Sequence, residues 1–182
     1  MALTKVIGDG VGTIASATIT SATISNQLTT SNLPTGSVLQ VVTAHYTAIE
    51  STSSTSLVAS SVLANITPTL ATSKILVDMK IQGILATAAT SNIELALYNG
   101  TEGGTYSSLL TWNQGSGYTN ASDERIYEAT AAFNFLHDVN NTNNNRYTVY
   151  FCVKGSGTVY YNNYSTANNS TASSITLMEI AA

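Results

Sequence analysis

The chain of 182 residues is long enough for one domain with a buried core and an extension, and its hydrophobic share of 43% is that of an ordinary globular protein. Charged residues make up only 9% and the net charge is −4, so six scattered lysines and arginines do not form the basic surface that a nucleic-acid-binding protein needs. No apolar run is long enough for a membrane span, and residues 1–10 lack the apolar core of a signal peptide. The single cysteine, Cys152, excludes an internal disulfide and a cysteine-rich metal site.

The first 36 residues differ in amino-acid composition from the rest of the chain. They contain only Lys5 and Asp9 as charged residues and no aromatic residue, and Pro34 and Gly36 mark their end. Their apolar side chains recur every four or five residues: Ile14, Ile19, Ile24, Leu28 and Leu33. A lone chain with this spacing cannot offset its conformational entropy by burial. We predict that residues 1–36 form an extended arm that attaches or trimerises by burying these five side chains against other chains; a disordered tail is the alternative.

From Ser37 onward, apolar segments alternate with polar or glycine-containing spacers, which is typical of strands joined by turns. Nine segments show this pattern: 37–49, 56–69, 74–85, 92–100, 107–114, 125–138, 146–155, 158–164 and 173–182. No helical pattern of useful length occurs, and the turn spacing is typical of sandwiches and barrels. We therefore predict an all-β protein in which residues 37–182 form an antiparallel β-sandwich of about eight or nine strands, preceded by the arm of residues 1–36.

The alternation is clearest in residues 74–85, where Ile75, Val77, Met79 and Ile81 point to one face and the intervening residues to the other. Three further groups are predicted to share inner faces in the same way: Ile93, Leu95 and Leu97; Phe133 and Phe135; and Tyr147, Val149, Phe151 and Val153. The Asn-Gly pair at 99–100 is expected to open a turn, and Gly-Ser-Gly at 155–157 predicts a hairpin between the segments that flank it.

Nothing in the sequence predicts catalysis. His45 and His137 have no metal-binding spacing, and Cys152 lies between Phe151 and Val153, where an inert thiol is the default. No nucleophile motif occurs, and the acidic residues are dispersed. We expect a protein that is not an enzyme, with no catalytic residue, metal site or cofactor. A paired-carboxylate enzyme acting on polysaccharide is a weak alternative, because such a pair forms only in space.

Aromatic residues beside Asn and Ser suggest a sugar contact. Trp112, Tyr118 and Tyr164 are the candidates for glycan binding, the first two at a glycine-rich loop. Tyr160 and Tyr161 alternate within a predicted strand, which favours core or inter-subunit packing for them.

An ordered set of stretches carries a resemblance to a known group of proteins. These are GSVLQVV at 36–42, NITPTLATSKILV at 65–77 and the terminal SSITLMEIAA at 173–182. Together with MALTKV and the Ile/Thr/Ser/Ala lead-in, they resemble the C-terminal domain of tailed-bacteriophage virion surface proteins, known as tail fibre, head fibre or decoration proteins. The resemblance covers nearly the whole chain but consists of structural residues, so it does not indicate one part of the virion.

This resemblance implies a jelly-roll-like sandwich, a homotrimer and no catalysis, with localisation in the virion after assembly in the bacterial host cytoplasm. The expected partners are other virion proteins of the capsid or tail, with no nucleic acid and no membrane. An arm of 36 residues reaches at most about 120 Å when fully extended, which favours a capsid decoration or cement protein, or a short fibre, over a long fibre. The alternative is a receptor-recognition module of a tail fibre that binds host-surface carbohydrate.

Overall fold

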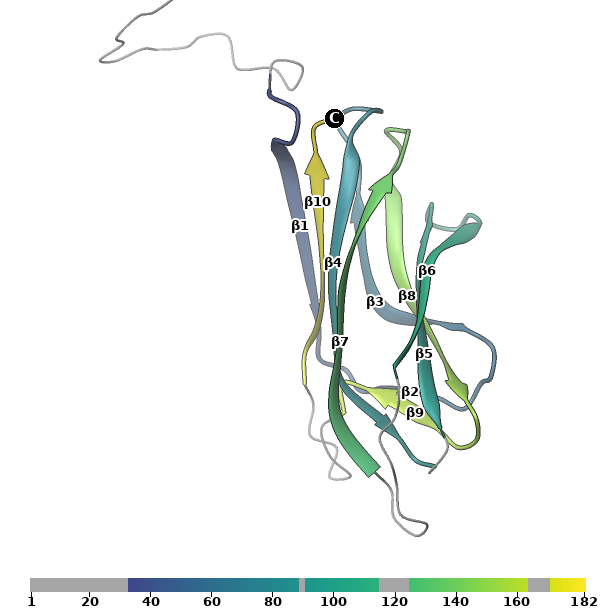
Figure 1. Cartoon of the computed structure of the whole chain (residues 1–182). Coiled ribbons are helices and arrows are strands. Elements are labelled where there is room, and N and C mark those ends of the chain that lie inside the picture. Colours follow the sequence, from purple (N-terminus) through teal and green to yellow (C-terminus); the bar gives the residue numbers. More distant parts are fainter. Residues whose placement is uncertain (1–32, 89–90, 115–124, 164–170) are drawn as a thin grey trace, which may run out of the picture.

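The computed structural model describes residues 33–88, 91–114, 125–163 and 171–182. In these residues the chain forms ten β-strands and no helix, which confirms the all-β prediction (Figure 1). The strands are β1 (Val38–Tyr46), β2 (Glu50–Thr52), β3 (Val58–Ile66), β4 (Lys74–Ala86), β5 (Asn92–Gly100), β6 (Tyr106–Gln114), β7 (Arg125–Asp138), β8 (Asn145–Lys154), β9 (Val159–Tyr161) and β10 (Ser173–Ile180).

Two antiparallel sheets face each other in Figure 1. Sheet A has the order β1-β10-β4-β9-β2, and β7 pairs with the other edge of β4. Sheet B has the order β3-β8-β5-β6. The main body therefore stacks β1-β10-β4-β7 on β3-β8-β5-β6, while β9 and β2 extend sheet A beside the far end of β4. This arrangement is a jelly roll, so the prediction of an antiparallel, jelly-roll-like sandwich is confirmed.

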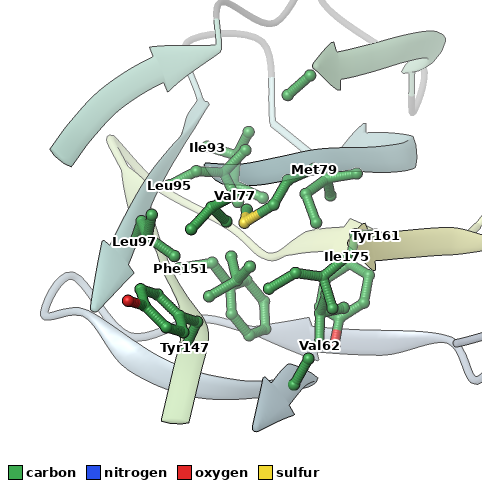
Figure 2. Close-up of a cluster of buried hydrophobic side chains, with 14 of the residues drawn as sticks. Val62, Val77, Met79, Ile93, Leu95, Leu97, Tyr147, Phe151, Tyr161 and Ile175 are labelled. Carbon is green, nitrogen blue, oxygen red and sulfur yellow. The ribbon is translucent and has the colours of Figure 1, made fainter. Parts of the chain in front are cut away.

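Alternate residues of the strands fill the space between the sheets (Figure 2). Ile75, Val77, Met79 and Ile81 of β4 are at most 1% exposed, as their spacing predicts. The other predicted inner groups also face the core: Ile93, Leu95, Leu97, Tyr147, Val149, Phe151 and Val153 are at most 2% exposed, and Phe133 and Phe135 pack against them. Burial of each such side chain contributes about 1.5–3 kcal/mol, and a one-residue slip would turn all of them outward.

A bulge divides β4 into two parts with different partners. The pairing of β4 with β7 shifts register between Ile81 and Ile84, and Gly83 lies at this point with φ of 59°. A side chain there would lie 2.5 Å from Thr171 Oγ1 and 2.7 Å from the Asn163 backbone nitrogen. Glycine therefore permits the close approach at the point where the pairing partner of β4 changes from β10 to β9.

One sequence prediction about a turn is wrong. The segment 155–157 does not close a hairpin of paired strands, because β8 belongs to sheet B and β9 to sheet A. The chain crosses between the sheets there, and β9 pairs with β2, a strand within the predicted polar spacer. The turn expected to open at Asn99 and Gly100 is present: β5 ends at Gly100, which pairs with Tyr106, and residues 101–105 connect β5 to β6.

Both ends of the described sandwich meet at one place. The Gly36 backbone nitrogen donates to the Ala181 carbonyl at 2.7 Å, and the Ala181 nitrogen donates to the Ser37 carbonyl at 2.9 Å. Next to them, β1 and β10 run side by side, and the C-terminus lies beside the start of β1 in Figure 1. The predicted arm therefore joins the sandwich at the end that also holds the C-terminus.

Candidate functional site

A row of apolar side chains crosses four strands on the outer face of sheet A. The register places Val41 of β1 opposite Met178 of β10, Met178 opposite Leu76 of β4, and Leu76 opposite Leu136 of β7. Their neighbours along the strands, such as Val77, are buried in the core, so the row points outward. An outer sheet face in contact with water normally carries polar residues, so this row marks a surface of interest.

Two more apolar residues, Val38 and Ile180, pair beside this row at the end of the sandwich where β1 begins. We call the six residues Val38, Val41, Leu76, Leu136, Met178 and Ile180 the sheet A patch. Val38, Val41 and Leu136 are 53%, 55% and 51% exposed, and they are all the exposed large hydrophobic residues in the described part of the chain. Such residues are unremarkable when scattered, but their gathering on one face is typical of an interaction site.

Polar residues border the sheet A patch. On one side the hydroxyls of Thr43 and Thr176 lie 3.1 Å apart and form a hydrogen bond across β1 and β10. On the other side, Lys74 Nζ and Asp138 Oδ1 form an exposed ion pair at 2.9 Å. An apolar centre with a polar border has the composition of a protein–protein interface.

A buried carboxylate holds together the end of the sandwich at which β1 begins. Glu179 of β10 is 0% exposed, and it accepts hydrogen bonds from Gln40 Nε2 at 2.6 Å and from the backbone nitrogen and hydroxyl of Thr69, both at 2.7 Å. Burial alone raises the pKa of a carboxyl group, but these hydrogen bonds and the nearby Ser73 hydroxyl outweigh it and hold the pKa of Glu179 below its ordinary value. Charged Glu179 therefore joins β1, β10 and the β3–β4 connection.

The two histidines lie far from each other. His45 is exposed on β1. His137 lies at the core side of β7, where its Nδ1 is 2.8 Å from Tyr147 Oη. Burial lowers the pKa of His137, and this effect exceeds that of the nearby charge of Asp138, which raises it. Burial raises the pKa of Tyr147. The pair is a hydrogen bond between two groups that are neutral at neutral pH.

The structure describes two of the eight predicted site residues, Leu33 and Trp112. Ile14, Ile19, Ile24, Leu28, Tyr118 and Tyr164 lie outside the described residues. Leu33 is described and half-buried. Trp112 lies on the core-facing side of β6, where its ring packs edge-on against Phe133 at a centroid distance of 4.1 Å. The arm and the glycan contacts at these positions remain predictions.

The outer face of sheet B carries three tyrosines that the sequence analysis did not select. The ring of Tyr150 on β8 lies 4.2 Å from that of Tyr98 on β5 and 6.4 Å from that of Tyr106 on β6. We call these three residues the tyrosine cluster. All three are half-buried, and burial raises the pKa of Tyr150, with smaller contributions from the other two. Strand alternation could have placed Tyr98 and Tyr150 outward, but only strand pairing brings Tyr106 to them.

Polar groups adjoin the tyrosine cluster on the same face. Arg146 precedes Tyr150 by four residues on β8, donates from Nε to Asn65 Oδ1 at 3.1 Å and forms an ion pair with Glu102. Between Arg146 and Tyr150 lies Thr148, which is 4% exposed. Among the described residues, no hydrogen-bond partner reaches its hydroxyl.

No metal site is formed by the described segments, in which no three His, Cys, Asp or Glu side chains converge. Cys152 is buried on β8, with its sulfur 3.7 Å from Glu94 Oε1, and burial raises the pKa of its thiol. Within the same described segments there is no helix with the length and apolar character needed to cross a membrane.

No protein-family model matches the chain, and no curated protein matches it. Among solved structures, it is similar to the crystal structure of the infectious bursal disease virus VP2 subviral particle, with 12% identity and a TM-score of 0.45 over 80% of this chain and 34% of that one. It is also similar to the structure of Eiger TNF from S. frugiperda, with 14% identity and a TM-score of 0.40 over 78% of this chain and 93% of that one. The chain thus spans about a third of the VP2 chain, and at these values no function follows from either similarity.

Proposed function

We propose that this protein is a non-enzymatic structural component of a bacteriophage virion. In this proposal residues 1–36 attach it to the particle and the sandwich stands on the particle surface, as a capsid decoration protein or a short fibre. The shortness of the arm favours decoration. The resemblance of the stretches at 36–42, 65–77 and 173–182 to virion surface proteins supports the assignment to a phage.

The sheet A patch is the observation that carries the proposal. A sandwich that works alone gains nothing from exposing Val38, Val41 and Leu136 together, whereas an assembly component buries such residues in its contacts. The patch lies at the end where Gly36 and Ser37 join the arm to the sandwich. Copies that pack through it therefore bring their arms together.

We infer that other copies of this chain cover the patch, in a homotrimer. Six apolar side chains are fewer than the roughly 20–30 residues that a stable interface uses on each side. The patch alone is therefore too small for a lasting contact. Burial of Ile14, Ile19, Ile24, Leu28 and Leu33 in adjoining arms would supply the rest, at about 1.5–3 kcal/mol for each fully buried side chain.

Light scattering of the purified chain after size-exclusion chromatography tests this proposal. We expect the full chain to form a trimer. The double variant Val41→Lys, Leu136→Lys should shift the equilibrium toward the monomer, because it would bury two charges in an apolar contact. Ala132→Lys is the matched control, since Ala132 is exposed on the same face of β7 outside the patch. A monomeric natural chain, or lysines without effect at positions 41 and 136, contradicts the trimer.

Particle binding tests the role of the arm. A chain without residues 1–32 retains every described residue, so we expect a folded sandwich that no longer binds phage particles lacking this protein. The full chain should bind them. Full binding by the shortened chain would show that the arm is not the attachment segment.

A further inference from the structure

We propose that the outer face of sheet B binds a neutral glycan, with Tyr98, Tyr106 and Tyr150 as the platform and Arg146 and Thr148 as its polar partners. A pyranose ring has an apolar C–H face, which packs on aromatic rings, and a rim of hydroxyls, which needs hydrogen-bond donors and acceptors close by. The tyrosine cluster supplies the first and its neighbours on β8 supply the second.

The rings are held in place before any ligand arrives. Tyr98 and Tyr106 both lie against Tyr150, from strands on one side of it, and the rings are tilted by 35° and 51° to that of Tyr150. Each side chain is half-buried, so part of every ring stays accessible. A platform that is already ordered loses little conformational entropy when a ligand binds.

Arg146 is positioned as a directional donor. Its side chain is only 20% exposed, and contacts with Asn65 and Glu102 orient the guanidinium. A guanidinium carries five N–H donors, and these two contacts use only some of them. The guanidinium also interacts with the Tyr106 side chain, which places it beside the rings, where the hydroxyls of a stacked sugar would be.

Thr148 gives an independent indication of a ligand. Its hydroxyl is buried on this face between Arg146 and Tyr150 and has no partner among the described residues. A buried hydroxyl without a partner is unfavourable, and a sugar hydroxyl or a water bridging to one would satisfy it.

The charges on this face indicate a neutral ligand. The cations Arg146 and Lys154 each form an ion pair with a carboxylate, Glu102 and Glu94 respectively. Within the described residues this face therefore offers no unpaired cation to attract an acidic polysaccharide. It also lies on the sheet opposite the sheet A patch, so packing through that patch would leave it accessible.

Binding of the full chain to immobilised dextran, mannan and galactan, with polygalacturonate as the acidic comparison, tests the proposal. We expect binding to at least one neutral polysaccharide and none to polygalacturonate. Tyr106→Ala and Tyr150→Ala should weaken the binding about tenfold or more, since each removes a stacking ring. Tyr160→Ala, a half-buried tyrosine on β9 of sheet A, is the matched control and should leave it unchanged.

Three results would overturn the proposal: no binding to any of the neutral polysaccharides, unchanged affinity in both cluster variants, or loss of binding in Trp112→Ala with the cluster variants unaffected. Hydroxyl-radical footprinting of the natural chain decides the matter if the alanine variants do not fold. Addition of the bound polysaccharide should then protect Tyr98, Tyr106 and Tyr150 from oxidation, and protection confined to other residues would refute the site. None of these measurements depends on the trimer or on the arm.

Discussion

Gln40 Nε2 donates a hydrogen bond of 2.6 Å to Glu179 Oε2, and this contact ties the first strand of the sandwich to the last. Glu179 is fully buried, although a carboxylate is costly to remove from water. Its hydrogen bonds from Gln40 and Thr69 offset that cost and join three segments at the end of the sandwich where β1 begins. The strength of this end of the sandwich therefore depends on one ionised group.

Glu179→Gln should lower the free energy of unfolding by about 1–3 kcal/mol at pH 7, because the new amide group turns a donor toward the donors that now bind the carboxylate. The pKa of Glu179 in the folded chain lies below its ordinary value of 4.5, so its contribution is complete above that value and is lost as the pH falls through the lowered pKa. Urea unfolding at a series of pH values should therefore show a difference between the two proteins that shrinks in acid.

Asp138→Asn serves as the control for that series. Asp138 is 66% exposed in its ion pair with Lys74, so its removal should cost less than about 1 kcal/mol. A Glu179→Gln protein as stable at pH 7 as the natural chain would contradict the role assigned to the carboxylate.

Asn162 should be among the most sensitive positions of the fold. It is fully buried with φ of 57°, its Nδ2 donates to the carbonyls of Tyr46 and Ala48 at 2.9 and 3.0 Å, and its Oδ1 accepts from Ser173 at 2.6 Å. Asn162→Ala should cost about 2–4 kcal/mol in urea unfolding, since it leaves these groups unpaired and strains the backbone. Asn162→Gly should cost less than Asn162→Ala, because glycine relieves the strain but not the lost hydrogen bonds; an equal loss in both would show that the backbone conformation contributes nothing.

Gly83→Ala should destabilise the sandwich more than Gly103→Ala does. Both glycines have positive φ, 59° and 75°, so each alanine pays about 1–2 kcal/mol for the left-handed conformation. Only at Gly83 would the new methyl group also overlap Thr171 and Asn163, whereas nothing lies within 4 Å at Gly103. The difference between the two melting temperatures measures the steric part, and equal melting temperatures would mean that the bulge relaxes freely.

Cys152 should react slowly in the folded protein. Its thiol is buried and burial raises its pKa, so little of the reactive thiolate forms at pH 8 and reagents cannot reach it. A disulfide exchange reagent followed by absorbance should give one equivalent of product only after guanidinium is added. Rapid stoichiometric reaction of the native chain would show that this face of β8 opens.

Patterns within a strand were predicted well. The alternation of Ile75, Val77, Met79 and Ile81 identified the inner face of β4, and the same argument identified the inner residues of β5 and β8. These predictions succeed because a strand with one buried face must alternate, whatever its partner is. The predicted hairpin at residues 155–157 failed because a glycine-containing turn permits a hairpin but does not show which strand lies beside the next one.

The sequence by itself determined an all-β chain and the residues that face its core. Only the tertiary structure decided which strands pair, and with that it placed Val41, Met178, Leu76 and Leu136 in one row and Tyr98, Tyr106 and Tyr150 in one cluster. The physical reason is the sequence separation of the contacts. Alternation depends on residues two positions apart in one strand, whereas the sheet A patch and the tyrosine cluster depend on hydrogen bonds and packing between strands far apart in the chain.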